Sequence, residues 1–234
     1  MRKDAVQARR QLTWLFDLDN TLHDASHAIF PAINVNMNAL IARVLDAESK
    51  PSHPEAVNDL RLAYWQRYGA TLLGMMRHHA VPSADFLRDA HQFDNLSQMI
   101  RAERGVGRWL KRLPGKKILL TNAPAAYSHA VIRHLGLHRH FAAHLPIESM
   151  LVHRQLRPKP SRLLLRQLLA KQRLRACDCV LVEDTLQNLK AAKSLGIHTV
   201  WITRYLSGNP ARPSFVNVQV KSLRQLPRQL HRLR

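Results

Sequence analysis

The 234-residue sequence has few acidic residues, few cysteines and no long hydrophobic run. Asp and Glu number 16 against 36 Lys and Arg, which leaves a formal net charge of +20. No apolar stretch approaches the roughly 18 residues that a membrane-spanning helix needs, so we expect no integral membrane protein. The apolar stretch behind the basic N-terminus stops at Asp17 and is shorter than the roughly 7 to 15 apolar residues of a secretory signal. We therefore expect a cytoplasmic protein.

The two cysteines, Cys177 and Cys179, are also informative through their scarcity and spacing. Residues two positions apart are too close for an ordinary disulfide framework, which agrees with a reducing compartment. The pair could hold a soft metal, but two of four expected ligands are missing, and two small residues entering a strand are the simpler interpretation. Eight Gly and twelve Pro without a period exclude collagen-like and low-complexity chains.

Short apolar runs that end in polar residues recur along the chain and predict buried parallel strands. They lie at residues 12–18, 116–120, 179–182 and 198–202, and a possible further strand contains Val216, Val218 and Val220. Helical patterns at 127–135, 161–171 and 186–195 fall between them, and the basic tail from Tyr205 predicts a terminal amphipathic helix. Alternating strands and helices predict an α/β fold with a mostly parallel sheet.

Residues 24–108 differ, because they contain no strand-like run and their apolar residues recur three or four positions apart. We expect helices at 54–68, 71–79 and 83–95 after an initial helix that contains Ile29, Ile33 and Met37. The simplest topology inserts this block after the first strand, over the carboxyl edge of the sheet. We therefore predict a core domain of residues 1–23 and 109–234 and an all-helical cap of residues 24–108.

Polar residues stand where the first two strands are expected to end, which is where open α/β sheets bind ligands. Asp17 and Asp19 are two apart, so in an extended chain their side chains leave on the same face. Carboxylates this close favour a bound cation or one protonated member, although an Asp that caps a turn is the alternative. Thr121 and Asn122 offer a hydroxyl and a backbone N–H to a phosphate, or an ordinary helix cap.

Two later positions carry similar chemistry. Lys159, between Pro158 and Pro160, precedes a helix, where a cation is unfavourable unless an anion is near; a solvated lysine is the alternative. Glu183 and Asp184 close the strand at 179–182 as metal ligand and neighbour, or as the cap of the next helix. None of these clusters is decisive by itself.

In this order, the clusters resemble the four motifs of the haloacid dehalogenase-like (HAD) hydrolase superfamily, over residues 13–203. The helical block resembles the C1 cap of its subfamily I, and the pyrimidine 5'-nucleotidase branch is the more specific resemblance. The residues that carry it are Asp17-Leu-Asp-Asn-Thr-Leu, Tyr68-Gly-Ala-Thr-Leu-Leu-Gly74 with His78-His79, Leu120-Thr-Asn, Arg157-Pro-Lys-Pro and Val182-Glu-Asp-Thr-Leu-Gln-Asn-Leu-Lys-Ala-Ala-Lys-Ser-Leu-Gly196. The resemblance implies a Rossmann-like three-layer core with a parallel sheet and an inserted helical cap.

The resemblance also implies a mechanism. Asp17 would attack phosphorus and form an aspartyl-phosphate, and Asp19 would protonate the leaving oxygen and then deprotonate water. Asp17, the backbone carbonyl of Asp19 and Asp184 would hold Mg²⁺ as cofactor. Thr121 and Lys159 would hold the phosphoryl oxygens. Glu183 stands where many members have glycine.

Further residues are expected to contact the substrate. Near the core these are Asn20, Thr21 and Asn122, and in the cap they are Tyr68, Gly69 and Thr71, which would read the base. If that cap segment does not read the leaving group, Asn34, Asn36 and His78 are the next candidates. Asn188 stands where many members have a second acid, which leaves the outer metal ligands open.

The expected function is a Mg²⁺-dependent phosphatase for pyrimidine nucleoside 5'-monophosphates such as UMP and CMP. A phosphatase or phosphomutase for small sugar phosphates is the enzymatic alternative. A nucleic-acid-binding protein is the alternative of a different class, because residues 154–175 carry eight Lys or Arg and no acid. No aromatic residues interleave that stretch, and basic helix faces are usually solvated. No sequence feature indicates an oligomeric state.

Overall fold

A computed structural model describes residues 11–206, 208 and 210–233 of the chain. At its centre lies a sheet of six strands, all paired in parallel, in the order β3-β2-β1-β6-β7-β8. The strands are β1 (Thr13–Phe16), β2 (Lys116–Leu120), β3 (Ala143–Leu145), β6 (Cys179–Glu183), β7 (His198–Ile202) and β8 (Val218–Val220). The predicted parallel α/β sheet is confirmed. The three residues of β3 were not predicted, because a run that short carries no hydrophobic pattern.

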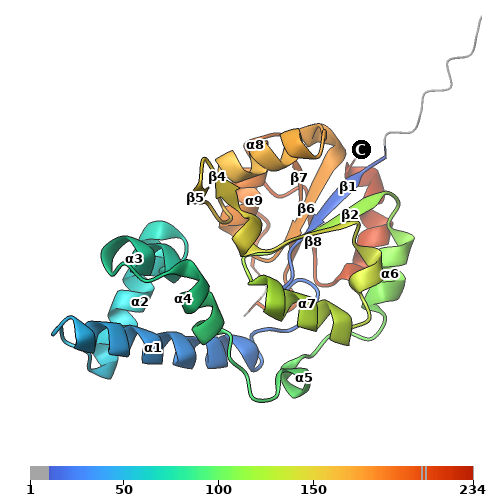
Figure 1. Cartoon of the computed structure of the whole chain (residues 1–234). Helices are drawn as coiled ribbons and strands as arrows, with labels where there is room; N and C mark the ends of the chain where they lie inside the picture. Colours follow the sequence, from blue (N-terminus) through green and yellow to red (C-terminus); the bar gives the residue numbers. More distant parts are fainter. Residues whose placement is uncertain (1–10, 207, 209, 234) are drawn as a thin grey trace, which may run out of the picture.

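Helices and 3₁₀ helices cover both faces of the sheet and give three layers (Figure 1). Alternate residues of β1 divide the core: Trp14 and Phe16 pack on one face and Leu15 on the other. The core helices are α6 (Val106–Arg112), α7 (Ala125–His134), α8 (Arg162–Lys171) and α9 (Leu186–Lys193). The 3₁₀ helices are η1 (His138–His140), η2 (Ile147–Ser149), η3 (Ala176–Asp178) and η4 (Leu223–Leu233). Residues of α6, α7 and η4 pack on the Trp14 face, and residues of α8 and α9 pack on the Leu15 face.

The C-terminal segment is a 3₁₀ helix, η4, rather than the expected amphipathic α-helix. Pro227 lies inside it, and proline removes a backbone donor and clashes with the carbonyl four residues earlier in an α-helix. The predicted amphipathic character is present: Leu223 and Leu226 are buried while Arg224 and Arg228 are exposed. An antiparallel hairpin of β4 (Leu151–Val152) and β5 (Gln155–Leu156) is a further element that the sequence pattern did not predict.

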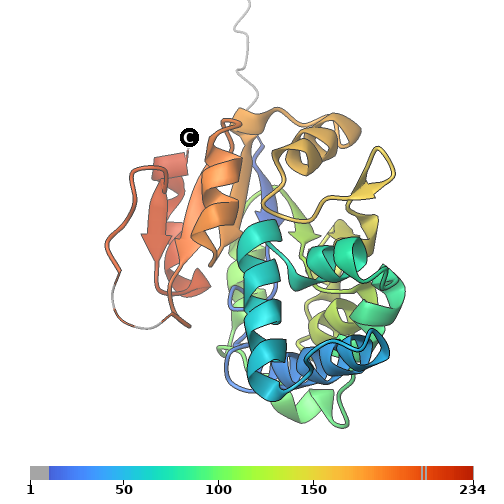
Figure 2. The same ribbon diagram turned by 90° about the vertical axis from the view of Figure 1, so that its left-hand side faces the viewer.

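Between β1 and β2 the described chain forms helices and no strand. Besides α6, the helices there are α1 (Ile29–Ala47), α2 (Pro54–Tyr68), α3 (Thr71–His78), α4 (Ser83–Ala90) and α5 (Leu96–Met99). Helices α1 to α4 share their own apolar cluster, which includes Ile41, Met75 and Phe86, and they stand to one side of the sheet (Figures 1 and 2). The cap boundary predicted after residue 108 falls inside α6, whose Val106 and Leu110 belong to the sheet's core.

The helix expected over 83–95 ends at Ala90. Beyond it the chain returns toward the core, where Phe93 packs against Tyr127 with ring centroids 5.7 Å apart. At the end of α2, Gly69 adopts a left-handed conformation with φ of 80°, which a residue with a side chain rarely does. None of the helices in the described ranges has both the length and the apolar composition to cross a membrane.

Candidate active site

Asp17, Lys159 and Glu183 meet in a buried ion-pair cluster at the carboxyl end of the sheet. The Nζ of Lys159 donates to Oδ1 of Asp17 at 2.6 Å and to Oε2 of Glu183 at 2.8 Å. The three side chains come from the ends of β1 and β6 and from the loop before α8, and all are buried. The two predicted site residues, Asp17 and Lys159, are therefore brought together. Glu183 takes part as the second partner of the lysine, which the sequence did not reveal.

Asp17, Glu183 and Asp184 each offer a carboxylate oxygen, and these oxygens lie within 4.8 Å of one another. Burial, followed by the charge of Glu183, raises the pKa of Asp17 to about 7 against the opposing effect of Lys159. Burial and the charges of Glu183 and Asp17 also raise the pKa of Asp184. One lysine cannot neutralise three crowded carboxylates, and oxygen ligands are those that hard divalent cations prefer. The donor set therefore fits Mg²⁺.

Asp19 lies in the same pocket and is held by two donors on one oxygen. Tyr127 Oη donates to Asp19 Oδ1 at 2.6 Å, and His23 Nε2 lies 2.8 Å from the same atom. Burial acts to raise the pKa of Asp19, but the hydrogen bonds from His23 and Tyr127 and the charge of His23 outweigh it, so that this pKa lies below its usual value. Neither Tyr127 nor His23 was a sequence-predicted site residue.

Thr121 and Asn122 follow β2, as predicted, and both line the pocket. The Oγ1 of Thr121 accepts the backbone N–H of Ala123 at 3.1 Å, which leaves its hydroxyl proton to donate. The side chain of Asn122 spans to the backbone of Lys159: its Nδ2 donates to the carbonyl at 3.0 Å, and its Oδ1 accepts the N–H at 2.9 Å. With both ends of its amide used, Asn122 positions the lysine loop.

Asn20 and Thr21 do not line the pocket among the described residues. Asn20 has a left-handed backbone with φ of 56°, and its Oδ1 accepts the backbone N–H groups of Ala25 and Ser26, both at 3.1 Å. It therefore fixes the turn that leads from β1 to the cap. The hydroxyl of Thr21 donates to Oδ2 of Asp17 at 3.4 Å.

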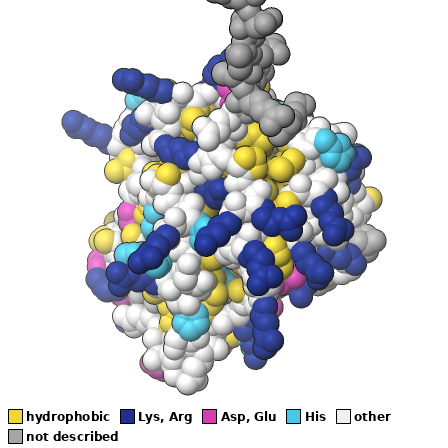
Figure 3. All heavy atoms as spheres, turned by 90° about the vertical axis from the view of Figure 1, so that its right-hand side faces the viewer, with side chains coloured by type: hydrophobic (Ala, Val, Ile, Leu, Met, Phe, Trp, Pro, Cys, Tyr) yellow, Lys and Arg dark blue, Asp and Glu magenta, His cyan; other side chains and the backbone are white. Residues whose placement is uncertain are grey.

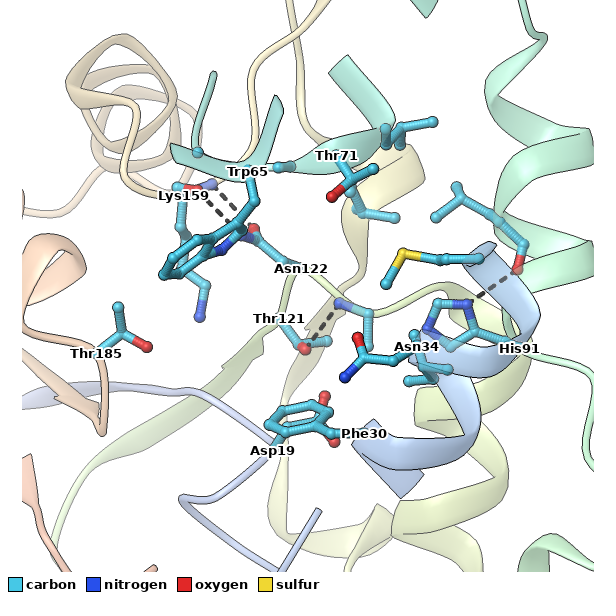
Figure 4. Close-up of a pocket in the computed structure, with 18 of the residues that line it drawn as sticks. Asp19, Phe30, Asn34, Trp65, Thr71, His91, Thr121, Asn122, Lys159 and Thr185 are labelled. Carbon is cyan, nitrogen blue, oxygen red and sulfur yellow. Dashed lines mark hydrogen bonds between the residues drawn. The ribbon is translucent and has the colours of Figure 1, made fainter. Parts of the chain in front are cut away.

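A pocket of about 550 Å³ joins these core residues to the inner side of the cap (Figure 4). The predicted cap residues are divided: Gly69 and Thr71 line it, whereas Tyr68 does not and pairs its hydroxyl with His78 Nε2 at 2.6 Å. The Thr71 hydroxyl donates to the backbone carbonyl of Arg61 at 3.1 Å. Asn188 also lines the pocket, in the first turn of α9.

Further lining residues come from α1 and α2, including Asn34, Arg61 and Trp65. Of these, the sequence indicated Asn34 as a secondary candidate but not Arg61 or Trp65. Asn36, the other secondary candidate on α1, does not line the pocket and donates to the backbone carbonyls of Ala90 and Gln92. Residues 61, 65 and 69 are spaced by four, so a search for polar and aromatic residues on one face of the predicted helix would have found Arg61 and Trp65.

Comparison with known proteins gives a family match and a set of similar folds. The model of the haloacid dehalogenase-like hydrolases matches residues 13–196. A HAD phosphatase from Thermococcus onnurineus is 16% identical, with 94% of this chain and 97% of that chain covered and a TM-score of 0.64. A 2-haloacid dehalogenase from Pseudomonas syringae pv. Tomato is 20% identical, with 96% and 100% covered and a TM-score of 0.57. YfnB from Bacillus subtilis, solved bound to magnesium, is 16% identical, with 95% and 99% covered and a TM-score of 0.57.

Proposed function

The chain belongs to the haloacid dehalogenase-like hydrolases, and within that family we propose that it is a Mg²⁺-dependent phosphomonoesterase. The similar structures include a phosphatase and dehalogenases, so the reaction class depends on the site itself. The observation that carries the proposal is the carboxylate of Asp19, held in the pocket by Tyr127 and His23. Halide leaves without a proton, whereas the alkoxide of a phosphoester needs one.

In the proposed reaction, Asp17 attacks phosphorus and forms an aspartyl-phosphate. Lys159 and the Thr121 hydroxyl hold phosphoryl oxygens, because both present donors to the pocket and phosphoryl transfer depends chiefly on positioning and charge stabilisation. Because the pKa of Asp19 lies below its usual value, its carboxylate has to take up a proton when an anionic phosphate binds beside it and disfavours its charge. Asp19 then passes that proton to the leaving oxygen and takes one from the water that hydrolyses the intermediate. Bound Mg²⁺ would neutralise the charge of nucleophile and phosphoryl group, held by Asp17, Asp184 and the backbone carbonyl of Asp19.

Nucleoside 5'-monophosphates, with UMP and CMP as the leading pair, are the proposed substrates. Two features of the pocket support these substrates. Its volume of about 550 Å³ suits a nucleoside monophosphate. The ring of Trp65, which is 54% exposed, gives a flat base a surface on which to stack. A sugar-phosphate phosphatase or phosphomutase would need neither the flat surface nor the apolar residues beside it.

The test is phosphate release, with Mg²⁺ or with a chelator, from UMP, CMP, ribose 5-phosphate and phenyl phosphate, together with chloride release from a 2-chloro acid. We expect Mg²⁺-dependent phosphate release that Asp17→Asn abolishes and that Asp19→Asn lowers by about 10²- to 10⁴-fold. Chloride release without phosphate release would make the protein a dehalogenase. Transfer of phosphoryl between two sugar positions without release would make it a mutase.

A second candidate function has one observation in its favour, a basic face on the side of the core away from the cap. Arg108, Lys111 and Arg112 of α6 and Arg224 and Arg228 of η4 are exposed, and none is in an ion pair among the described residues. Figure 3 shows Lys and Arg widely spread over this face with few acidic side chains. Binding to short RNA that survives a rise in salt would support a nucleic-acid role, and collapse with modest added salt would mean nonspecific attraction.

A further inference from the structure

Arg61, in the middle of α2, is held by three asparagine side chains on the cap side of the pocket. Its Nε donates to Oδ1 of Asn38 at 2.9 Å, Nη1 donates to Oδ1 of Asn34 at 3.1 Å, and Nη2 donates to Oδ1 of Asn58 at 2.8 Å. Asn34 and Asn38 lie on α1 and Asn58 lies on α2, so the guanidinium is fixed between two helices. A long, flexible side chain is thereby oriented before any ligand binds.

No carboxylate among the described residues forms an ion pair with Arg61. Arg43 and Arg88, also on the cap, both pair with Asp89. The carboxylates that line the pocket are Asp17, Asp19, Glu183 and Asp184, and all of them belong to the core. Partial burial lowers the pKa of Arg61, and no acidic group offsets that effect. The pocket therefore contains a positioned positive charge that the protein itself does not neutralise.

The cluster around Arg61 presents donors to a ligand. A guanidinium has five N–H groups, and the three asparagines use one on each nitrogen, which leaves one on Nη1 and one on Nη2. Each asparagine must turn its oxygen toward the guanidinium, because its NH₂ group cannot accept a hydrogen bond. Of the three asparagines only Asn34 lines the pocket, and its NH₂ group is a further donor there. With two free guanidinium N–H groups and this NH₂ group, the cluster favours a ligand that supplies acceptors.

Trp65 lies one helical turn beyond Arg61 on the same face of α2. Trp65, Lys159 and Asn34 all line the same pocket and are labelled in Figure 4. Leu62, 37% exposed, lines the pocket from the same face of the helix. A flat leaving group attached to a phosphoryl group at Lys159 can stack on Trp65 and extend its outer edge toward Arg61.

We propose that Arg61 and Trp65 form the leaving-group subsite, which selects a group whose outer edge carries oxygen acceptors and no amino group. This inference rests on the proposed phosphatase function and names its substrate class. Among pyrimidine nucleotides it selects uracil over cytosine, since uracil has a carbonyl oxygen at the edge farthest from the ribose where cytosine has an amino group. An amino group there would face the guanidinium of Arg61, which has no acceptor to receive it. A carboxylate on the leaving group supplies the same acceptor chemistry.

The experiment measures kcat/KM of the full chain, with Mg²⁺, for UMP, CMP, 3-phosphoglycerate and phenyl phosphate. Phenyl phosphate has a flat leaving group without polar atoms and therefore reports the phosphoryl site alone. We expect the wild type to prefer UMP, or 3-phosphoglycerate if the acceptor is a carboxylate, over CMP by about 10-fold or more. A hydrogen bond to a charged donor corresponds to roughly 10- to 100-fold in binding.

Arg61→Met should lower kcat/KM for the preferred substrate by about 10- to 100-fold, mainly through KM, and leave phenyl phosphate within about twofold. Arg67→Met is the matched control: Arg67 lies on the same helix, its guanidinium is 5.4 Å from the centre of the Tyr68 ring, and it does not line the pocket. The Arg67→Met variant should leave kcat/KM unchanged for both substrates.

Two results would overturn the proposed subsite. The first is a wild type that hydrolyses UMP, CMP and 3-phosphoglycerate with kcat/KM values within about threefold of one another. The second is an Arg61→Met variant that loses phenyl phosphate hydrolysis as severely as UMP hydrolysis. The first comparison needs no variant, so it stands even if Arg61→Met folds poorly. Failure of the proposed function looks different, because then the wild type releases phosphate from none of the four substrates.

Discussion

Tyr127 donates a hydrogen bond from its hydroxyl to Oδ1 of Asp19 at 2.6 Å, joining α7 to the turn after β1. His23 Nε2 approaches the same oxygen at 2.8 Å. Because both donors converge on Oδ1, the other carboxylate oxygen, Oδ2, is the one available to exchange a proton with the leaving group. The Tyr127 ring is itself buried against His91 and Phe93, at centroid distances of 5.4 and 5.7 Å. The orientation of Asp19 is therefore fixed by packing.

Replacing Tyr127 with Phe removes the hydroxyl and keeps the ring. We expect kcat for UMP, which has a poor alkoxide leaving group, to fall by about 10-fold or more, because proton transfer from a mispositioned Asp19 is slow. Hydrolysis of p-nitrophenyl phosphate should fall by less than about threefold, because its leaving group departs without a proton. The measurement is kcat on both substrates. An equal loss on both would show that Tyr127 acts on the phosphoryl site or on folding.

Mg²⁺ affinity should depend on pH through Asp17 and Asp184. Burial and the neighbouring Glu183 raise the pKa of Asp17 to about 7, and the pKa of Asp184 is also raised, so at lower pH the ion must displace protons. We expect the affinity to increase as pH rises through about 7, the pKa of Asp17. Calorimetric titration in two buffers with different heats of ionisation measures the protons released. Affinity that is flat between about pH 5.5 and 8 would contradict this expectation.

Asp17→Asn should stabilise the metal-free protein at alkaline pH. Since folding raises the pKa of Asp17 from 3.8 to about 7, the folded state binds more protons than the unfolded state between these values. The stability of the metal-free wild type therefore falls as pH rises through this window. The amide removes the buried charge, and we expect the variant to gain on the order of a few kcal/mol at about pH 8 and little at about pH 4.

Thermal unfolding of wild type and Asp17→Asn, both in a chelator, checks this pH dependence. The difference in Tm should grow between about pH 4 and 7 and then remain constant. A variant that is less stable than the wild type at about pH 8 would mean that the pairing of Lys159 with Asp17 outweighs the cost of burying the charge.

Asn122→Ala should lower activity through Lys159. The two hydrogen bonds between the Asn122 amide and the Lys159 backbone, at 3.0 and 2.9 Å, hold the lysine loop against the end of β2. Their loss should reduce kcat/KM by about 10-fold, and by the same factor for UMP and p-nitrophenyl phosphate, because both share the phosphoryl group. Steady-state kinetics on the two substrates measure it. A loss confined to UMP would instead place Asn122 against the leaving group.

The sequence predicted the sheet well because its central strands are apolar on both faces, as in Leu119 and Leu120 of β2, and end in polar residues. Patterns of this kind are local. The end of α4 at Ala90 and the strand at Ala143–Leu145 depend instead on distant contacts, such as Phe93 on Tyr127 and the pairing of Leu145 with Leu120. Local periodicity contains no information on such contacts.

The candidate site shows the same division. Asp17 could be predicted from its position at a strand end, where the topology of a parallel sheet brings polar residues to one edge, and Lys159 from its place between two prolines just before a helix. The pairing of Lys159 with Glu183, the hold of Tyr127 on Asp19 and the asparagines around Arg61 join residues from different elements. In the sequence, Glu183 looks like an ordinary strand end and Tyr127 like an aromatic residue of the core. The asparagines around Arg61 look like a solvated helix face.

The exposed ring of Trp65 allows ligand binding to be followed by the intrinsic fluorescence of the protein. All four tryptophans lie in the described ranges; Trp14 and Trp201 are buried in the core, Trp109 is half-buried on α6, and Trp65 lines the pocket with 54% of its surface exposed. Indole emission shifts to longer wavelength in water, so the light that the protein emits at the long-wavelength edge of its spectrum comes mostly from this one residue. A molecule that covers the ring will quench or shift that emission, and occupancy of the pocket can be followed without a label and without turnover.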